Sequence, residues 1–299
     1  MTYAEFKETI VAYMQEKLGP NVKVALQDII KNNDTHLDGL TVFSDQTNIS
    51  PTIYLNYYFK QYEKGAPIEE ICEDVYQVYS NSKPKSNIDV SFFTQFEKVK
   101  ERIVFKLVNF QKNQAMLANI PYIRFLDLAI IFNCLVEADS EGSATILIQN
   151  QHLALWHINK NDLYEIAKEN TPKLLSYDIT SMGEILNKVL FGDEDDSPLP
   201  LCDSPVPMYV LSNHHRFNGS GCILYKGLLQ TLAQKLCSSF YILPSSIHEV
   251  LLIPTTKTSA STLEFTSIVQ DVNKTHLANE EYLSDSVYYY CMETDTVTM

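Results

Sequence analysis

The first 80 residues carry two hydrophobic patterns, one typical of helices and one typical of strands. Thr2 and Glu5 form a capping box, and apolar residues recur every three or four positions as far as Met14. We therefore expect an amphipathic helix over residues 1–17, which the Gly-Pro pair at 19–20 would end.

A β-hairpin and two further helices are expected next. Residues 22–30 and 37–43 are rich in apolar, β-branched positions, and a polar turn of Asn32, Asn33 and Asp34 separates them. The elements expected after this hairpin are a strand at 53–55, a tyrosine-rich helix ending at Gly65, and a helix from Pro67 to about Tyr79.

Three predicted hairpins, each followed by a helix, organise the rest of the chain. The paired apolar segments are 126–137 with 145–156, 208–213 with 221–225, and 240–243 with 248–253. Because hairpins pair antiparallel, we expect an α+β fold with mixed or mainly antiparallel sheets and with helices packed on one face.

Single elements lie between and after these hairpins. Residues 94–106 fit either a helix or a helix that passes into a strand. The other expected elements are helices at 161–168, 182–190, 228–236 and 263–272, and a strand at 282–290.

Two polar segments divide the chain. Residues 80–87 contain Pro84, serines and lysines, and this linker predicts an N-terminal α+β domain at 1–85 and a C-terminal α+β domain at 88–299. Residues 192–207 hold four consecutive acidic residues and four prolines, which predicts an exposed loop within the second domain.

Composition and charge limit the classes of partner. The 299 residues are 45% hydrophobic and 20% charged, which is typical of a globular protein with a packed core. The net charge is -14, no run of basic residues is present, and nucleic-acid affinity comes mainly from Lys and Arg that neutralise phosphates. We therefore expect a protein or small-molecule partner, and neither nucleic acid nor an anionic membrane.

The apolar segments and the cysteines predict a cytoplasmic protein. The N-terminal segment lacks the apolar core of a signal peptide, and the most apolar stretch, 125–136, is too short to span a bilayer. The six cysteines form no close pair, which favours reduced structural thiols and no metal or cofactor. They are Cys72, Cys134, Cys202, Cys222, Cys237 and Cys291.

Residues 244–249 form the segment most suggestive of catalysis. Ser245 or Ser246 could be a nucleophile beside His248, yet neither serine lies in a G-x-S-x-G turn. His248 and Glu249 begin no HExxH motif, and in a strand they would point to opposite faces. The structural interpretation, a tight turn in which the serine hydroxyls bond the backbone, is therefore favoured.

Glu249 needs a partner under either interpretation. Its apolar neighbours at 250–253 predict a buried strand, and an unpaired buried carboxylate is unfavourable by several kcal/mol. We expect Glu249 to contact a backbone amide, a serine hydroxyl or a basic side chain, with Ser245, Ser246 and Arg216 as candidates.

Two other polar segments are weaker candidates. Asn32, Asn33, Asp34 and Asp38 resemble half of a hard-cation site, but an EF-hand-type loop is absent and a hairpin turn is favoured. The glycines at 219 and 221 fit no phosphate-binding motif, and we expect them to supply positive φ angles in a hairpin.

Several segments, in order along nearly the whole chain, resemble one uncharacterised bacterial family. They are the stretch from Lys31-Asn-Asn-Asp through Leu37-Asp-Gly-Leu, Asn48-Ile-Ser-Pro-Thr-Ile-Tyr-Leu, Phe93-Thr-Gln-Phe-Glu-Lys-Val-Lys, Asp127-Leu-Ala-Ile, Tyr209-Val-Leu-Ser-Asn, Phe240-Tyr-Ile-Leu-Pro-Ser-Ser-Ile-His-Glu-Val, and the stretch from Val272-Asn through Leu283-Ser-Asp-Ser-Val-Tyr. The family is domain of unknown function 5688, found mainly in gut Firmicutes. Residues 146–170 more weakly resemble a second uncharacterised Firmicutes family of cytosolic α/β proteins. Neither resemblance implies an activity.

The leading hypothesis is a non-enzymatic intracellular protein that binds or regulates. The alternative is a hydrolase-like enzyme that uses Ser245 or Ser246 with His248, Glu249 and Asp285. A cleft that brings His248, Glu249 and Asp285 together would favour the enzyme.

Overall fold

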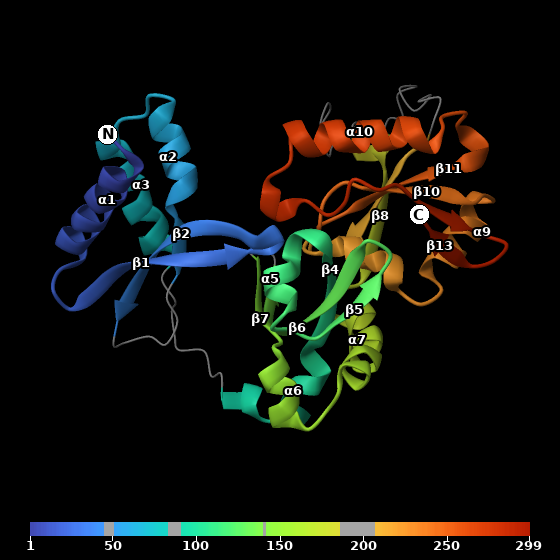
Figure 1. Ribbon diagram of the computed structural model, residues 1–299, viewed down its shortest axis with the longest axis horizontal. Coiled ribbons are helices and arrows are strands. Elements are labelled where there is room, and N and C mark those ends of the chain that lie inside the picture. The colour runs from blue at the N-terminus through green and yellow to red at the C-terminus, as the bar shows by residue number, and fades with distance from the viewer. Residues whose placement is uncertain (45–50, 83–90, 140–141, 186–206) are drawn as a thin grey trace. The chain divides into compact units, whose positions relative to one another are not determined.

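The computed structural model describes residues 1–44, 51–82, 91–139, 142–185 and 207–299 (Figure 1). Contacts between residues divide the chain into two compact units. The first unit holds Met1–Lys31 and Thr35–Ser91, and the second holds Asn32–Asp34 and Phe92–Met299. The predicted linker at 80–87 falls mostly outside the described residues, so the domain division at 1–85 and 88–299 stays a prediction.

The first unit packs three helices on one face of an antiparallel sheet, as Figure 1 shows for these elements. Its elements are α1 (Tyr3–Leu18), β1 (Val22–Lys31), β2 (Thr35–Ser44), β3 (Thr52–Tyr54), α2 (Leu55–Glu63) and α3 (Ile68–Asn81). The capping box is confirmed, because Thr2 and Glu5 exchange side-chain and backbone hydrogen bonds at the start of α1. Gly19 ends α1 with a φ of 78°, a left-handed value that favours glycine.

The core of the first unit follows the predicted helix period. Phe6, Ile10 and Met14 are fully buried on α1, and they share one apolar cluster with Leu40 and Val42 of the sheet. The strand register sets Val24 opposite Val42, so alternate residues of the hairpin face the helices. Local periodicity was sufficient to predict this unit.

The second unit contains a four-stranded and a six-stranded sheet, both antiparallel. The strands of the smaller sheet are β4 (Ile103–Asn109), β5 (Tyr122–Phe125), β6 (Leu128–Asp139) and β7 (Gly142–Leu147). The larger sheet, in spatial order, holds β13 (Thr296–Thr298), β12 (Tyr288–Cys291), β10 (Phe240–Pro244), β11 (Val250–Pro254), β9 (Tyr209–Asn213) and β8 (Tyr177–Ser181). These sheets and their helices are the predicted α+β, mainly antiparallel fold.

Helices and short 3-10 turns connect these strands. The helices are α4 (Phe96–Val99), α5 (Gln114–Leu117), α6 (Asn150–Trp156), α7 (Lys160–Leu174), α9 (Leu228–Leu236) and α10 (Thr262–Thr275). The 3-10 turns are η1 (Asn32–Asp34), η2 (Ser91–Thr94), η3 (Lys100–Arg102), η4 (Gln111–Asn113), η6 (Gly219–Leu224), η7 (Thr255–Lys257) and η8 (Asn279–Glu281). Within the described ranges, no helix is long and apolar enough to cross a membrane.

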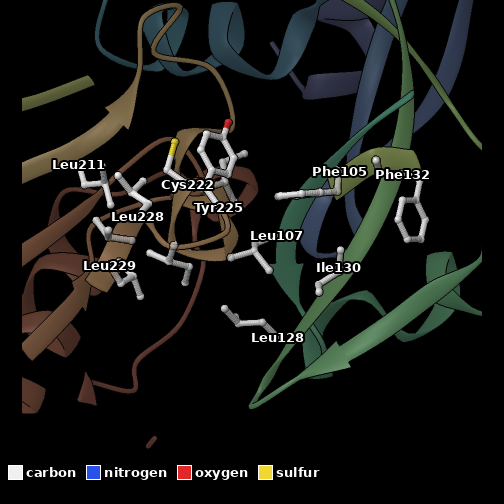
Figure 2. Packing of buried hydrophobic residues seen from close by; sticks show 14 of the residues in the cluster. Phe105, Leu107, Leu128, Ile130, Phe132, Leu211, Cys222, Tyr225, Leu228 and Leu229 are labelled. Carbon is white, nitrogen blue, oxygen red and sulfur yellow. The ribbon is translucent and has the colours of Figure 1, made fainter. Parts of the chain in front are cut away.

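One apolar core joins the two sheets of the second unit. Figure 2 shows Phe105, Leu107 and Ile130 of the smaller sheet facing Leu211 and Leu228, which come from β9 and α9. The opposite face of the larger sheet packs a separate cluster against α10. Helices therefore cover both faces of the six-stranded sheet, whereas helices on one face were predicted. The reason is that consecutive residues of the central strands β10 and β11 are apolar and buried, so both faces of the sheet need a cover.

Several predicted elements differ from the structure. Residues 221–225 are not a strand: η6 occupies most of that segment, and β9 pairs instead with β8 and β11. Residues 150–156 form α6 rather than the end of a strand, and the predicted strand at 282–290 begins only at Tyr288. Strands β5, β8 and β13 were not predicted, because each is short and each is specified by its partner strand rather than by its own pattern.

Other predictions are confirmed or fall outside the described residues. The segment 94–106 is a helix that passes through η3 into β4, one of the two alternatives, and α9 has the predicted bounds. Nearly all of the loop at 192–207 and most of the helix at 182–190 lie outside the described residues, as does Cys202. The five described cysteines are all free.

Removal of the α1 cap should destabilise the first unit. Thr2→Ala deletes the side-chain oxygen that accepts from Glu5 N, and we expect it to lower the free energy of unfolding by about 1 kcal/mol. Thr9→Ala is the matched control, because the exposed Thr9 hydroxyl bonds only a carbonyl within the same helix. Equal urea-denaturation midpoints for Thr2→Ala and Thr9→Ala would contradict this role of the cap.

Candidate functional site

The segment Pro244–Glu249 is a tight turn between β10 and β11. The backbone amides of Ser245 and Ser246 both donate to the carbonyl of Glu249, at 3.3 and 3.2 Å. The Ser246 hydroxyl accepts from the backbone amide of His248 at 2.9 Å. Because β11 begins at Val250, both His248 and Glu249 precede the strand that was predicted to contain them.

The partner of Glu249 is the hydroxyl of Ser245. Ser245 Oγ donates to Glu249 Oε1 at 3.4 Å, which confirms the predicted contact with a serine. Arg216, the basic candidate, pairs instead with Asp178, at 2.6 Å. Glu249 is partly exposed, because it lies in the turn and not within the buried strand.

The His248 ring is held as a neutral hydrogen-bond acceptor. Its Nδ1 accepts from the backbone amide of Asn218 at 3.2 Å, so the proton of the neutral ring lies on Nε2. Burial lowers the pKa of His248, and Lys106 lowers it further, whereas Glu281, Glu249 and the Arg216 backbone act in the opposite direction.

Asp285 lies in a different hydrogen-bonded group. Asn273 Nδ2 donates to Asp285 Oδ1 at 2.8 Å and to the Ser284 carbonyl at 3.0 Å. Burial, with Asp285 nearby, raises the pKa of Tyr282 to about 12. Among the hydrogen bonds between described residues, none joins the His248 ring to Asp285 or to a serine hydroxyl.

The backbone of the turn is bound by two serines from outside it. Ser220 Oγ donates to the carbonyl of Ile247, and Ser212 Oγ donates to the carbonyl of His248, both at 2.7 Å. These bonds join β9 and η6 to the β10–β11 turn. The polar residues of this region therefore fix the backbone, as the structural interpretation of the segment requires.

Gly219 allows this arrangement through its lack of a side chain. A Cβ at Gly219 would meet Ser212 Oγ and would lie 2.5 Å from the His248 carbonyl oxygen. The left-handed residue is Asn218, with a φ of 53°, and no positive φ occurs at Gly219 or Gly221. The expectation of positive-φ glycines in a hairpin was wrong, since the requirement at Gly219 is close backbone approach.

A network around the half-buried carboxylate of Asp127, which sequence reasoning missed, joins the two sheets. Asp127 Oδ2 accepts from Ser284 Oγ at 2.6 Å, and Asp127 Oδ1 accepts from Tyr288 OH at 2.7 Å. Burial, followed by the charge of Asp127, raises the pKa of Tyr288. The phenol is a permanent donor to this carboxylate.

The η1 turn is bound by asparagines rather than arranged as a complete cation site. Asn33 and Asn113 exchange two hydrogen bonds of 2.7 and 2.8 Å, and Asn33 Nδ2 also donates to the carbonyls of Asn279 and Tyr282. Among the candidate oxygens, Asn32 Oδ1 and Asp34 Oδ1 are buried without a partner, which is too few for a hard cation. In the described part of the chain, no group of three or more His, Cys, Asp or Glu side chains could hold a metal.

An open groove of about 630 Å³ lies beside β5, between the segment after α5 and the starts of α6 and α7. The residues that line this β5 groove are Leu117, Ala118, Ile120, Pro121, Tyr122, Arg124, Asn150, Leu153 and Lys160. Among the residues that the structure describes, the only charged ones in this lining are Arg124 and Lys160, both cationic. Neither is in an ion pair with any described residue.

Comparison with known proteins gives one match, to a protein family. The model of the family of unknown function DUF5688 matches residues 3–292. The chain belongs to DUF5688. No curated protein and no solved structure matches it.

The region that matches DUF5688 includes both the β10–β11 turn and the β5 groove. The sequence alone had indicated only the turn as a candidate site. Arg124 and Lys160 belong to none of the motifs considered in the sequence. Arg124 also lies on β5, a strand that was not predicted. One sequence feature could have indicated the groove. Tyr122 and Arg124 are two positions apart, and this spacing places both side chains on one face of a strand.

Gly219→Ala should strongly destabilise the protein. The new Cβ would overlap Ser212 Oγ and the His248 carbonyl, and we expect a loss of roughly 2 kcal/mol or more in the free energy of unfolding. Gly221→Ala is the control, because its nearest neighbour, at 3.4 Å, is the end of the Phe105 ring. Similar urea midpoints for the two variants would contradict the close-approach explanation.

Acidification should destabilise the protein through His248. Because the folded pKa is lowered, the unfolded state binds more protons as the pH falls below about 6.5, and the free energy of unfolding then declines. The contribution of His248 is fully present above that pH and is lost at no more than about 1.4 kcal/mol per pH unit.

The measurement compares urea unfolding at about pH 7.5 and 5.5 in wild type and in His248→Gln, which cannot titrate. The variant should lose less stability between the two pH values than wild type does. His36→Gln is the control, because His36 is exposed beside Asp28. Equal losses in wild type and His248→Gln would refute the prediction.

Proposed function

We propose that the protein is a non-enzymatic binding protein and that its ligand site is the β5 groove. The observation that carries this proposal is the combination of an open groove with cationic lining residues that have no acidic partner among the described residues. Concave sites with an apolar surface and a few convergent polar groups are the usual binding sites of proteins.

The geometry of the turn supports binding over catalysis. A general base must reach the proton of its nucleophile, but the Nδ1 lone pair of His248 is occupied by Asn218 N. The hydroxyl of Ser245 is directed to Glu249, and that of Ser246 accepts from a backbone amide. The hydrolase alternative would require these hydrogen bonds to be exchanged on binding of a substrate.

A cytosolic location is part of the same proposal. Cys72, Cys134 and Cys222 are buried free thiols, as in proteins of reducing compartments. Binding of a small molecule or a protein partner in the cytosol of a Firmicutes cell would fit a regulatory role.

The proposal predicts small-molecule ligands that are lost when the groove is filled. A library of metabolites screened by thermal shift against the full chain should give stabilising compounds, because ligands that bind the folded state raise its melting temperature. Ala118→Trp should abolish these shifts, since Ala118 is exposed and lines the groove. Ala154→Trp is the control, because Ala154 is exposed on α6 but does not line the groove.

Two results would contradict the binding proposal. One is a set of hits that Ala118→Trp and Ala154→Trp leave equally intact, or no hits at all. The other is labelling of wild type by a fluorophosphonate probe that is lost in Ser245→Ala or Ser246→Ala, which would support the hydrolase.

A further inference from the structure

We infer that the β5 groove binds a small molecule carrying an oxyanion, either a carboxylate or a phosphate monoester, on an apolar body. The inference rests on the proposed binding function and names the class of ligand. It follows from the charge of the groove, the fixation of Arg124 and the apolar floor.

The charge of the groove is opposite to that of the protein. The chain has 37 acidic and 23 basic residues, yet among the residues that the structure describes no Asp or Glu lines the groove. A groove whose described lining has only Arg124 and Lys160 as charges attracts anions and disfavours cations.

Arg124 is held in place by groups that leave its outer nitrogens available. Its Nε donates to the Leu126 carbonyl at 3.1 Å, and its guanidinium lies 4.0 Å from the centre of the Phe110 ring. No hydrogen bond to a described residue uses Nη1 or Nη2 of Arg124. A guanidinium fixed in this way can bind two oxygens of a carboxylate or phosphate with little loss of side-chain entropy.

The carbonyl that holds Arg124 comes from the hairpin turn after β5. Phe125 pairs with Leu128, so Leu126 is the first residue of a two-residue turn, and its φ of 55° is the left-handed value that such turns require. The turn directs the Leu126 carbonyl at Arg124 Nε.

The floor of the groove suits an apolar group. Leu117, Ile120 and Leu153 line it and expose only 4%, 3% and 9% of their surface. Tyr122 and Asn150 add polar groups to the same lining, and the Tyr122 ring lies 5.9 Å from that of Phe110. An aromatic or aliphatic body would therefore cover the floor while its anionic group reached Arg124.

Size and charge separate a small molecule from larger anions. A volume of about 630 Å³ matches the 300–1,000 Å³ range of small-molecule sites. Two cations are few for a nucleic acid, which is also repelled by the net charge of -14. An acidic peptide is the remaining competitor, and the experiment tests it directly.

The test is isothermal titration of the full chain with four naphthalene probes. The anionic probes, 1-naphthoate and 1-naphthyl phosphate, should bind at least tenfold more tightly than neutral 1-naphthol and cationic 1-naphthylmethylammonium. The ratio between the two anions identifies the carboxylate or the phosphate as the preferred group. An aspartate-rich peptide is titrated in parallel, and it should bind more weakly than both anions.

Variants assign the effect to the groove. Arg124→Gln should weaken the anionic probes at least tenfold and leave 1-naphthol within twofold. Arg124→Lys keeps the charge but loses the planar pair of donors, and it should weaken them at least threefold. Lys160→Gln should weaken them severalfold. Lys235→Gln is the charge-matched control on α9, outside the groove, and should change nothing. Circular dichroism and melting temperatures establish that each variant is folded.

The outcomes separate the ligand class from the binding function. Equal binding of 1-naphthol and the anions, unaffected by Arg124→Gln, overturns the oxyanion but leaves the groove as a binding site. If no probe binds but library hits are lost in Ala118→Trp, the oxyanion inference is likewise overturned and the groove remains a binding site. Tighter binding of the acidic peptide overturns the small-molecule inference. If no probe binds and no library hit depends on Ala118, both proposals fail.

Discussion

The second unit depends on one apolar contact between its two sheets. One face of β4 and β6, with Phe105, Leu107 and Ile130, packs against Leu211 and Leu228 (Figure 2). Each fully buried side chain of this size contributes roughly 1.5–3 kcal/mol relative to an exposed one. Neither sheet can bury this apolar face without the other. The packing of the two sheets therefore sets where the polar groups between them lie.

The hydrogen-bonded polar groups between the sheets are consequences of this contact. Asp127 comes immediately before β6, and it receives hydrogen bonds from Ser284 and Tyr288 of the C-terminal segment. Ser212 and Ser220 similarly bind the carbonyls of the β10–β11 turn. These hydrogen bonds satisfy groups that burial would otherwise leave unpaired, and an unpaired buried group is unfavourable by about 1–3 kcal/mol. The hydrogen bonds around the β10–β11 turn and around Asp127 are therefore explained by the structure alone.

The β5 groove has no comparable structural explanation. Neither Arg124 nor Lys160 has an acidic partner among the described residues, and Arg124 is held by the Leu126 carbonyl and the Phe110 ring. Polar groups of the β10–β11 turn are hydrogen-bonded within the protein, whereas the charged groups of the β5 groove are free to bind a ligand. Among the described residues, this difference favours the groove over the turn as the functional candidate.

The sequence by itself determined the elements whose cause is local. The capping box of Thr2 and Glu5, the end of α1 at Gly19 and the β1–β2 hairpin all depend on residues within a few positions of one another. The contact of Ser245 with Glu249, four residues apart, was predicted for the same reason. The net charge of -14 gave the expectation that nucleic acid is not a partner, and this expectation stays a prediction.

The tertiary structure alone decided the features that join distant positions. Ser284 reaches Asp127 across 157 positions, and β5 exists as a strand because β6 pairs with it. Residues 221–225 have the composition of a strand, yet β11 occupies the place beside β9 that this segment would need. Hydrophobic periodicity specifies which face of an element is buried, but it does not specify the partner, since many partners bury the same apolar area. The β5 groove therefore could not be predicted from the sequence, because its residues come together only through tertiary packing.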